Sequence, residues 1–112
     1  MESNNEFIVA AAIKYRPIGF RAGFMVRVGK SHAEIIRYFA DIGLKRSDRE
    51  PDTEEQGFWT TTNRFVTREE AYQIAKDQNQ LIESSNENNV QLVSENVNYR
   101  GILTEHSFYL QD

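Results

Sequence analysis

The side chains best suited to bind a ligand are clustered in one short segment, residues 57–71. They comprise three aromatic residues and two arginines, namely Phe58, Trp59 and Phe65 with Arg64 and Arg68. Aromatic rings stack on flat heterocycles, and a guanidinium group binds phosphate oxygens through two parallel hydrogen bonds. The N–H groups at the start of a helix attract the same anions. The segment therefore indicates binding of a small anionic ligand rather than catalysis.

Arg68 is the most specific candidate because it lies in the first turn of an expected helix. We predict that Thr67 caps this helix and that Glu70, three residues later, completes a capping box. The helix dipole disfavours a cation there by roughly 0.3 to 1 kcal/mol, so a bound anion would turn an unfavourable position into a site. The alternative is a solvent-exposed arginine paired with Glu69 or Glu105, an interaction that contributes little.

The aromatic residues of this segment could instead belong to the hydrophobic core, which is the commoner role of such side chains. Phe58 and Trp59 are neighbours in an expected strand, so their side chains must point to opposite faces. Arg64 and Phe65 are also neighbours, so their side chains are likewise expected to point to opposite faces. We therefore expect both faces of this hairpin to be in use, with a helix, a ligand or a partner subunit covering the second face. This expectation favours a homo-oligomer.

Catalytic patterns are weak in this chain. It has two histidines, His32 and His106, and no cysteine. Neither histidine belongs to a His-Glu-x-x-His zinc pattern or starts a His-x-Ser/Thr phosphoesterase motif. His32 lies on the same side of its expected helix as Ile35 and Ile36, where it could close a pocket or be an ordinary, partly buried residue. We expect no enzyme activity, no catalytic residues, no metal and no cofactor.

An α+β fold is expected to position these residues, with a small antiparallel sheet packed with two α-helices. The expected strands are residues 7–15, 23–28, a segment around Phe58 and residues 64–66, with one or two more within residues 90–97 and 101–110. The expected helices start at caps Ser31 and Thr67 and end at Gly43 and near Gln80. Their apolar faces are Ile35, Ile36, Phe39 and Ala40 in the first and Ala71, Ile74, Ala75 and Gln78 in the second. Residues 45–56 and 83–89 are predicted to be loops, the second one flexible.

Charge and composition narrow the classes of partner. The net charge of −4 is uneven: residues 1–49 carry nine basic and five acidic side chains, and residues 50–112 carry four and twelve. An acidic chain without a long basic stripe is a poor candidate for binding nucleic acid polymers, whereas a small anion needs only a few arginines. The longest apolar run, residues 7–13, is far shorter than the ~20 residues that span a membrane. The lack of cysteine and of a signal peptide predicts a cytoplasmic protein without a membrane partner.

The pattern of residues 57–71, followed by Ala75 and Gln80, resembles small phage-encoded proteins that share GF-x-T, RF-V-x-R-x-EA and A-x-x-x-x-Q motifs. Residues 29–36 resemble the helix start of the same proteins, and residues 104–106 stand where they tend to have Ser-Glu-Asp. The pattern also resembles the first Thoeris anti-defence family, phage proteins that sequester cyclic ADP-ribose isomers made by bacterial TIR-domain enzymes. This chain departs from the pattern at His106, where an acidic residue is usual.

The resemblance implies one nucleotide-binding domain, residues 1–112, that assembles into dimers or higher oligomers in the host cytoplasm, with pockets at the subunit contacts. It implies sequestration of a cyclic ADP-ribose isomer, and of cyclic oligonucleotides at separate sites in some relatives. We expect the ligand to be bound by Phe58, Trp59, Arg64, Phe65, Thr67, Arg68, His32 and Glu105. Two alternatives stay open: a small phosphodiesterase that uses His32 or His106 to cleave the same signal, and a phage protein that blocks a host protein through Phe58 and Trp59.

Overall fold

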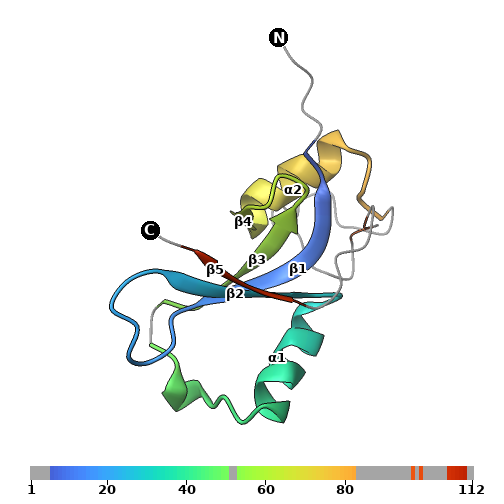
Figure 1. The fold of residues 1–112 in the computed structure, drawn as a ribbon. Helices are drawn as coiled ribbons and strands as arrows, with labels where there is room; N and C mark the ends of the chain where they lie inside the picture. The colour runs from blue at the N-terminus through green and yellow to red at the C-terminus, as the bar shows by residue number, and fades with distance from the viewer. Residues whose placement is uncertain (1–5, 51–52, 83–96, 98, 100–105, 111–112) are drawn as a thin grey trace.

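The computed structural model describes residues 6–50, 53–82, 97, 99 and 106–110 (Figure 1). Its elements are β1 (Ile8–Tyr15), β2 (Phe24–Gly29), α1 (His32–Asp41), the 3-10 helix η1 (Arg46–Asp48), β3 (Glu55–Thr60), β4 (Phe65–Thr67), α2 (Arg68–Asp77) and β5 (His106–Leu110). The strands form one antiparallel sheet in the order β4-β3-β1-β2-β5. The predicted α+β class is therefore confirmed.

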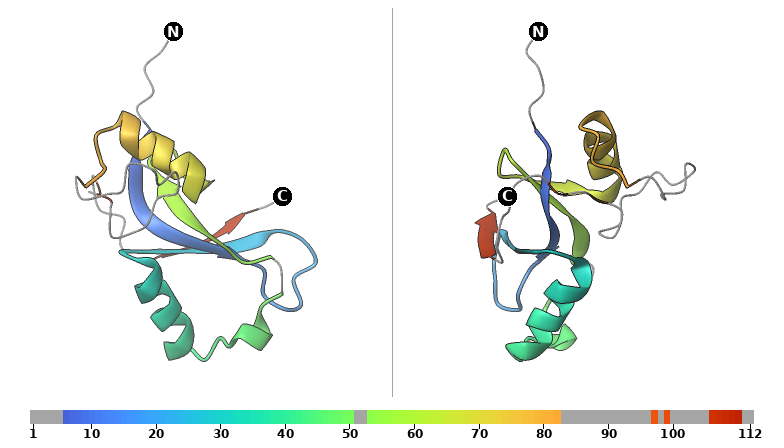
Figure 2. Two further views of the ribbon diagram at one scale, coloured as in Figure 1. Left: turned by 180° about the vertical axis from the view of Figure 1, so that it is seen from behind. Right: turned by 90° about the vertical axis from the view of Figure 1, so that its right-hand side faces the viewer.

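Both helices cover the same face of the sheet, as the two views of Figure 2 show. α1 packs on β1 and β2, and α2 packs on β3, β4 and β1. The core between helices and sheet contains Ile8, Ala11, Ile13, Tyr15, Ile35, Phe39, Phe58, Val66, Ala71, Ile74, Ala75 and Val97. Burial of these side chains is the main force that fixes the helices on the sheet.

A second apolar cluster lies on the opposite face of the sheet. Trp59 from β3 stacks on Phe108 from β5, with ring centroids 4.4 Å apart and planes 10° apart, although β1 and β2 lie between these strands in the sheet. The sheet must curl for the two rings to meet, and the small side chains of Ala10 and Ala12 lie buried in the same cluster. The prediction that Phe58 and Trp59 point to opposite faces is confirmed, and Trp59 finds its second surface within its own chain.

The predicted caps at the two helix starts, Ser31 and Thr67, are confirmed. Ser31 Oγ accepts a hydrogen bond from the Glu34 N–H, and Thr67 Oγ1 accepts one from the Glu70 N–H, each at 3.1 Å. Gly43 follows α1 with a φ of 77°, a left-handed conformation that glycine adopts without strain. These contacts are local, which is why a sequence pattern suffices to predict them.

The predicted apolar stripe of α1 is partly wrong. His32, Ile35 and Phe39 are buried, but Ile36 is 49% exposed and Ala40 is also exposed. The buried side chains are spaced by three and four residues, so they form a narrower face of the helix than the predicted stripe. Ile36 lies beside this face.

Two element boundaries also differ from the prediction. α2 ends at Asp77, earlier than Gln80, because Asn79 adopts a left-handed φ of 61° and turns the chain. The turn buries Gln80, whose side chain accepts from the Ile8 N–H at 2.9 Å and donates to the Ile8 carbonyl at 2.8 Å. Residues 45–56 are not only a loop, since they hold η1 and the start of β3. The predicted loop at residues 83–89 lies outside the described residues.

The two helices are short. Each has ten residues, and no helix in the described part of the chain is long and apolar enough to cross a membrane.

Candidate functional site

The aromatic residues expected to bind a ligand mainly pack within the protein. Phe58 and Trp59 are 0% and 2% exposed, so neither ring offers an accessible surface. Phe65 is half-buried, and its ring lies so close over Gly57 that a Cβ atom there would come within 2.6 Å of it. Glycine at position 57 thus allows Phe65 to cover the strand. Glu105 lies outside the described residues.

His32 joins α1 to β3. Its Nε2 atom lies 2.8 Å from the Gly57 carbonyl oxygen, and its ring meets the edge of Phe58 at a centroid distance of 5.1 Å. A carbonyl oxygen only accepts, so Nε2 carries the proton in this contact. The histidine is buried and positions the start of α1.

Arg64 belongs to a network of charged and hydroxyl groups at the β3–β4 turn. Its Nε and Nη2 atoms donate to the two oxygens of Glu6 at 2.6 and 2.9 Å. The hydroxyls of Thr60 and Thr62 donate to the same carboxylate, each at 2.6 Å. The hydrogen bond from Arg64 is the main cause that lowers the pKa of Glu6 from 4.5 to about 2, against the opposing effect of burial. Glu6 is therefore a buried carboxylate that stays charged.

The same network occupies the Nε and Nη2 donors of Arg64. Besides its two bonds to Glu6, its Nη2 atom lies 2.9 Å from an oxygen of Glu70. The hydrogen bond to Glu6 raises the pKa of the guanidinium above its already high usual range. With two carboxylates beside it, Arg64 has little capacity left for an external anion.

Arg68 has a different environment, four residues further along the chain. Its Nη2 atom donates to the side-chain oxygen of Gln56, a neutral group. Its Nε atom is buried and has no hydrogen-bond partner among the described residues. A hollow of about 230 Å³, which we call the Arg68 hollow, is lined by Glu55, Gln56, Thr67, Arg68 and Glu69. Two residues of the predicted site, Thr67 and Arg68, thus meet at one surface depression.

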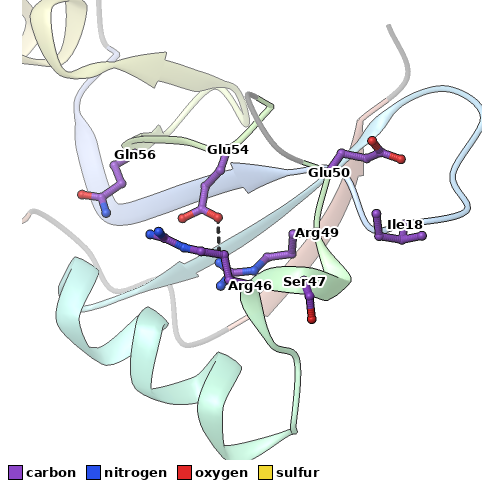
Figure 3. A pocket seen from close by; sticks show the side chains of 7 residues that line it. All are labelled: Ile18, Arg46, Ser47, Arg49, Glu50, Glu54 and Gln56. Atoms are coloured by element: carbon purple, nitrogen blue, oxygen red, sulfur yellow. Dashed lines mark hydrogen bonds and ion pairs between the residues drawn. The ribbon is translucent and has the colours of Figure 1, made fainter.

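A larger cavity of about 790 Å³ lies between the β1–β2 loop, η1 and β3 (Figure 3). Its lining is Ile18, Arg46, Ser47, Arg49, Glu50, Glu54 and Gln56, and we call it the Arg46 cavity. Two backbone hydrogen bonds fix its walls, from the Ile18 N–H to the Asp48 carbonyl at 2.9 Å and from the Glu50 N–H to the Arg16 carbonyl at 2.7 Å. The cavity therefore has a defined frame.

The two arginines of the Arg46 cavity are not equivalent. Arg49 donates to Glu54 at 2.7 Å and its guanidinium lies 4.8 Å from the ring centre of Phe39, so it mainly holds its own segment against α1. Arg46 is exposed and makes no side-chain hydrogen bond or ion pair with the residues that the structure describes. Figure 3 shows its side chain extending from η1 towards the Gln56 end of the cavity. Arg46 thus supplies an available cation.

Gln56 connects the two depressions because it lines both. The result is a strip of hydrogen-bond donors in the order Arg46, Gln56, Arg68. Two guanidinium groups and one amide are suited to anionic oxygens. Among the described residues, no group of three or more histidine or acidic side chains is placed to bind a metal ion.

Residues 7–98 match the family described as Phage T4 y16D protein. The chain belongs to this phage protein family. The matched range includes every residue that lines the Arg68 hollow and the Arg46 cavity. No curated protein and no solved structure matches the chain.

Sequence reasoning identified only part of the site in this y16D-family chain. It found Thr67 and Arg68 from the helix-start pattern but missed Arg46, Arg49 and Gln56, because residues 45–56 have no apolar period. One available signal was the spacing of the two arginines. Residues three apart lie on the same side of a 3-10 turn, so Arg46 and Arg49 could have been expected to face a common space.

Proposed function

We propose that this phage protein binds and sequesters an anionic cyclic nucleotide signal, without cleaving it, on the strip formed by Arg46, Gln56 and Arg68. The observation that carries the proposal is that the exposed Arg46 lines a cavity of about 790 Å³, which shares Gln56 with the hollow that Arg68 lines. Pockets that bind small ligands commonly enclose ~300 to 1,000 Å³. The class of ligand follows the resemblance to Thoeris anti-defence proteins, which favours a cyclic ADP-ribose isomer.

The charges around the Arg46 cavity suggest how such a ligand would lie. Gln56 and the Arg46 guanidinium mark one end of the lining in Figure 3, and Ile18 and Glu50 mark the other. Phosphate oxygens suit the arginine end, where each charge-assisted hydrogen bond contributes about 1.5 to 3 kcal/mol. A nucleobase suits the other end, where Ile18 offers an apolar contact and the Glu50 carboxylate can accept from an amino group.

Sequestration is favoured over cleavage by the composition of the site. The residues that line the two depressions include no histidine. His32 is buried against Phe58, and His106 lies on β5, in contact with Phe108 on the opposite face of the sheet. A phosphodiesterase that relies on either histidine would need it close to the phosphate.

A second candidate function is inhibition of a host protein. Ile18, Phe20 and Tyr109 are exposed apolar side chains, and the rings of Phe20 and Tyr109 lie 6.1 Å apart. Exposed apolar groups that gather in this way are typical of protein interfaces. This surface differs from the one expected from Phe58 and Trp59, which are buried.

The test is a thermal-shift screen of cyclic nucleotides, including cyclic ADP-ribose isomers, followed by native mass spectrometry. We expect a shift with at least one ligand, a complex of matching mass, and intact ligand after heat denaturation of the protein. Arg46→Ala should reduce the shift, whereas Arg37→Ala, which removes an exposed arginine of α1, should not. Recovery of a cleaved product would support the phosphodiesterase. No shift with any nucleotide would support the host-protein inhibitor.

A further inference from the structure

We infer that α1 binds α1 of a second copy of this chain in an antiparallel arrangement, so that the protein forms a homodimer through this helix. Figure 1 and Figure 2 both show α1 at the end of the molecule away from α2. The described lining of the Arg68 hollow and of the Arg46 cavity comes from other elements, so this surface is separate from the proposed ligand site. It also differs from the contact expected through Phe58 and Trp59, which are buried within their own chain.

An apolar side chain at the middle of α1 is left uncovered. Ile36 is 49% exposed, and Ala33 and Ala40, three residues before it and four after it, are also exposed. Residues at these spacings lie on one side of an α-helix. A second helix that packs on this side can bury Ile36, and the small alanine side chains allow the two backbones to approach each other closely.

A row of charged side chains borders this apolar side. Glu34, Arg37 and Asp41 follow one another at spacings of three and four residues, and Lys30 directly precedes the cap of the helix. All four are exposed, and none makes a side-chain hydrogen bond or ion pair with another residue that the structure describes. Along the chain their charges alternate in the order positive, negative, positive, negative.

This alternation of charge decides the orientation of the second helix. A two-fold axis that crosses α1 beside Ile36 brings Glu34 level with Arg37 of the second copy, and Lys30 level with Asp41 of the second copy. Both contacts join opposite charges, and the symmetry repeats each of them. A parallel pair would instead place each charge beside the same charge. Antiparallel pairing therefore gives all four charged groups a partner and buries Ile36 of both copies.

The size of the contact sets the expected strength of the dimer. α1 has ten residues and is therefore about 15 Å long, so we expect the pair to bury less than the ~1,200 to 2,000 Å² of a stable complex. The dimer should be in equilibrium with the monomer at micromolar concentrations and should dissociate further as salt screens the exposed charges. Sedimentation equilibrium measures both effects. A chain that stays monomeric at about 1 mM, a concentration at which even weak complexes form, would overturn the inference.

Charge-swap variants test the orientation of the two helices. Glu34→Arg and Arg37→Glu each turn the attractive contacts into repulsive ones, so each variant alone should dimerise about tenfold more weakly. An equal mixture of the two variants should form a heterodimer, because one copy then carries two positive charges and the other two negative charges. The double variant, with both substitutions in one chain, should recover the homodimer. A mixture and a double variant that associate no better than the single variants would overturn the inference.

The apolar contact has its own test. Ile36→Ser should lower the dimerisation constant at least tenfold, whereas Ile42→Ser, which removes another exposed isoleucine just after α1, should not. An unchanged melting temperature in dilute solution, where the parent is monomeric, shows that Ile36→Ser still folds. Equal dimerisation of this variant and the parent would overturn the inference.

The inference and the proposed function fail separately. Ile36→Ser should keep the nucleotide affinity of the parent, because the strip formed by Arg46, Gln56 and Arg68 lies within one chain. A parent protein that binds a cyclic nucleotide but never dimerises would overturn the inference alone. A parent that dimerises but binds no cyclic nucleotide would overturn the proposed function and support the inference.

Discussion

Arg64 and Arg68 lie four residues apart, yet they have opposite environments. Arg64 donates to both oxygens of Glu6 and contacts Glu70, so two of its nitrogen atoms are already paired with carboxylates of the protein. Arg68 meets only the neutral side chain of Gln56, and its Nε atom has no partner in the described ranges. The arginine of the β3–β4 turn is therefore part of an internal network, whereas the arginine at the start of α2 is the one that we propose for ligand binding.

The difference shows that residue type alone does not make an anion site. A guanidinium binds an external phosphate well only when internal carboxylates do not already occupy its donors. Both arginines belong to the same short motif, so the motif cannot distinguish them. The partner residues can, and Glu6 lies 58 positions from Arg64 in the sequence.

The largest effect on stability is expected when the turn network loses its carboxylate. Glu6→Ala removes the acceptor of Arg64, Thr60 and Thr62, and we expect the free energy of unfolding to fall by about 2 to 4 kcal/mol. Urea denaturation measures the change. Glu70→Ala is the matched control, because it removes only the exposed partner of Arg64 and should cost at most ~1 kcal/mol. Equal losses in the two variants would show that the buried network has no special role.

Acid should weaken the same network by a somewhat smaller amount. The pKa of Glu6 is lowered from 4.5 to about 2, so its contribution is complete above pH 4.5 and is lost as the pH falls towards 2. Arg64 is 46% exposed and partly screened by water, so we expect a loss of about 1 to 3 kcal/mol over this window. Unfolding measured between pH 5 and 2 tests this expectation. Glu6→Gln should flatten the pH dependence, and a parallel dependence in the variant would contradict the assignment.

Loss of a helix cap should lower stability by a smaller amount. A comparison of the two caps also distinguishes an effect on stability from an effect on binding. Thr67→Ala removes the cap of α2 and Ser31→Ala removes that of α1, and each should cost about 1 kcal/mol. Only Thr67 also lines the Arg68 hollow. Calorimetry should therefore detect weaker nucleotide binding in Thr67→Ala than in Ser31→Ala. If the two variants lose the same affinity, the hollow is not a binding site.

The parts of the fold that depend on neighbouring residues could be predicted from the sequence. The caps at Ser31 and Thr67 and the glycine after α1 are decided within a few residues. The alternation of side chains along β3 likewise predicts that Phe58 and Trp59 point to opposite faces of the sheet. The curl of the sheet that brings Trp59 onto Phe108 could not be predicted, because it joins residues 49 positions apart.

The candidate site could be predicted only in part for the same reason. Arg68 was found because the start of a helix has a local signature. Arg46 and Gln56 became candidates only when the fold placed η1 and β3 around one cavity. No local pattern around Arg64 indicates that this arginine pairs with Glu6, 58 positions away.

The contrast between the two arginines can be measured directly by calorimetry on Arg64→Ala and Arg68→Ala with the same cyclic nucleotide, together with their melting temperatures. Loss of one charge-assisted contact corresponds to about 1.5 to 3 kcal/mol, so Arg68→Ala should bind roughly tenfold to more than a hundredfold more weakly. Its stability should stay the same or rise by at most ~1 kcal/mol, because a cation leaves a helix N-terminus. Arg64→Ala should keep its affinity and melt at a lower temperature. The opposite pattern, with retained affinity and a sharp fall in melting temperature for Arg68→Ala, would contradict the account.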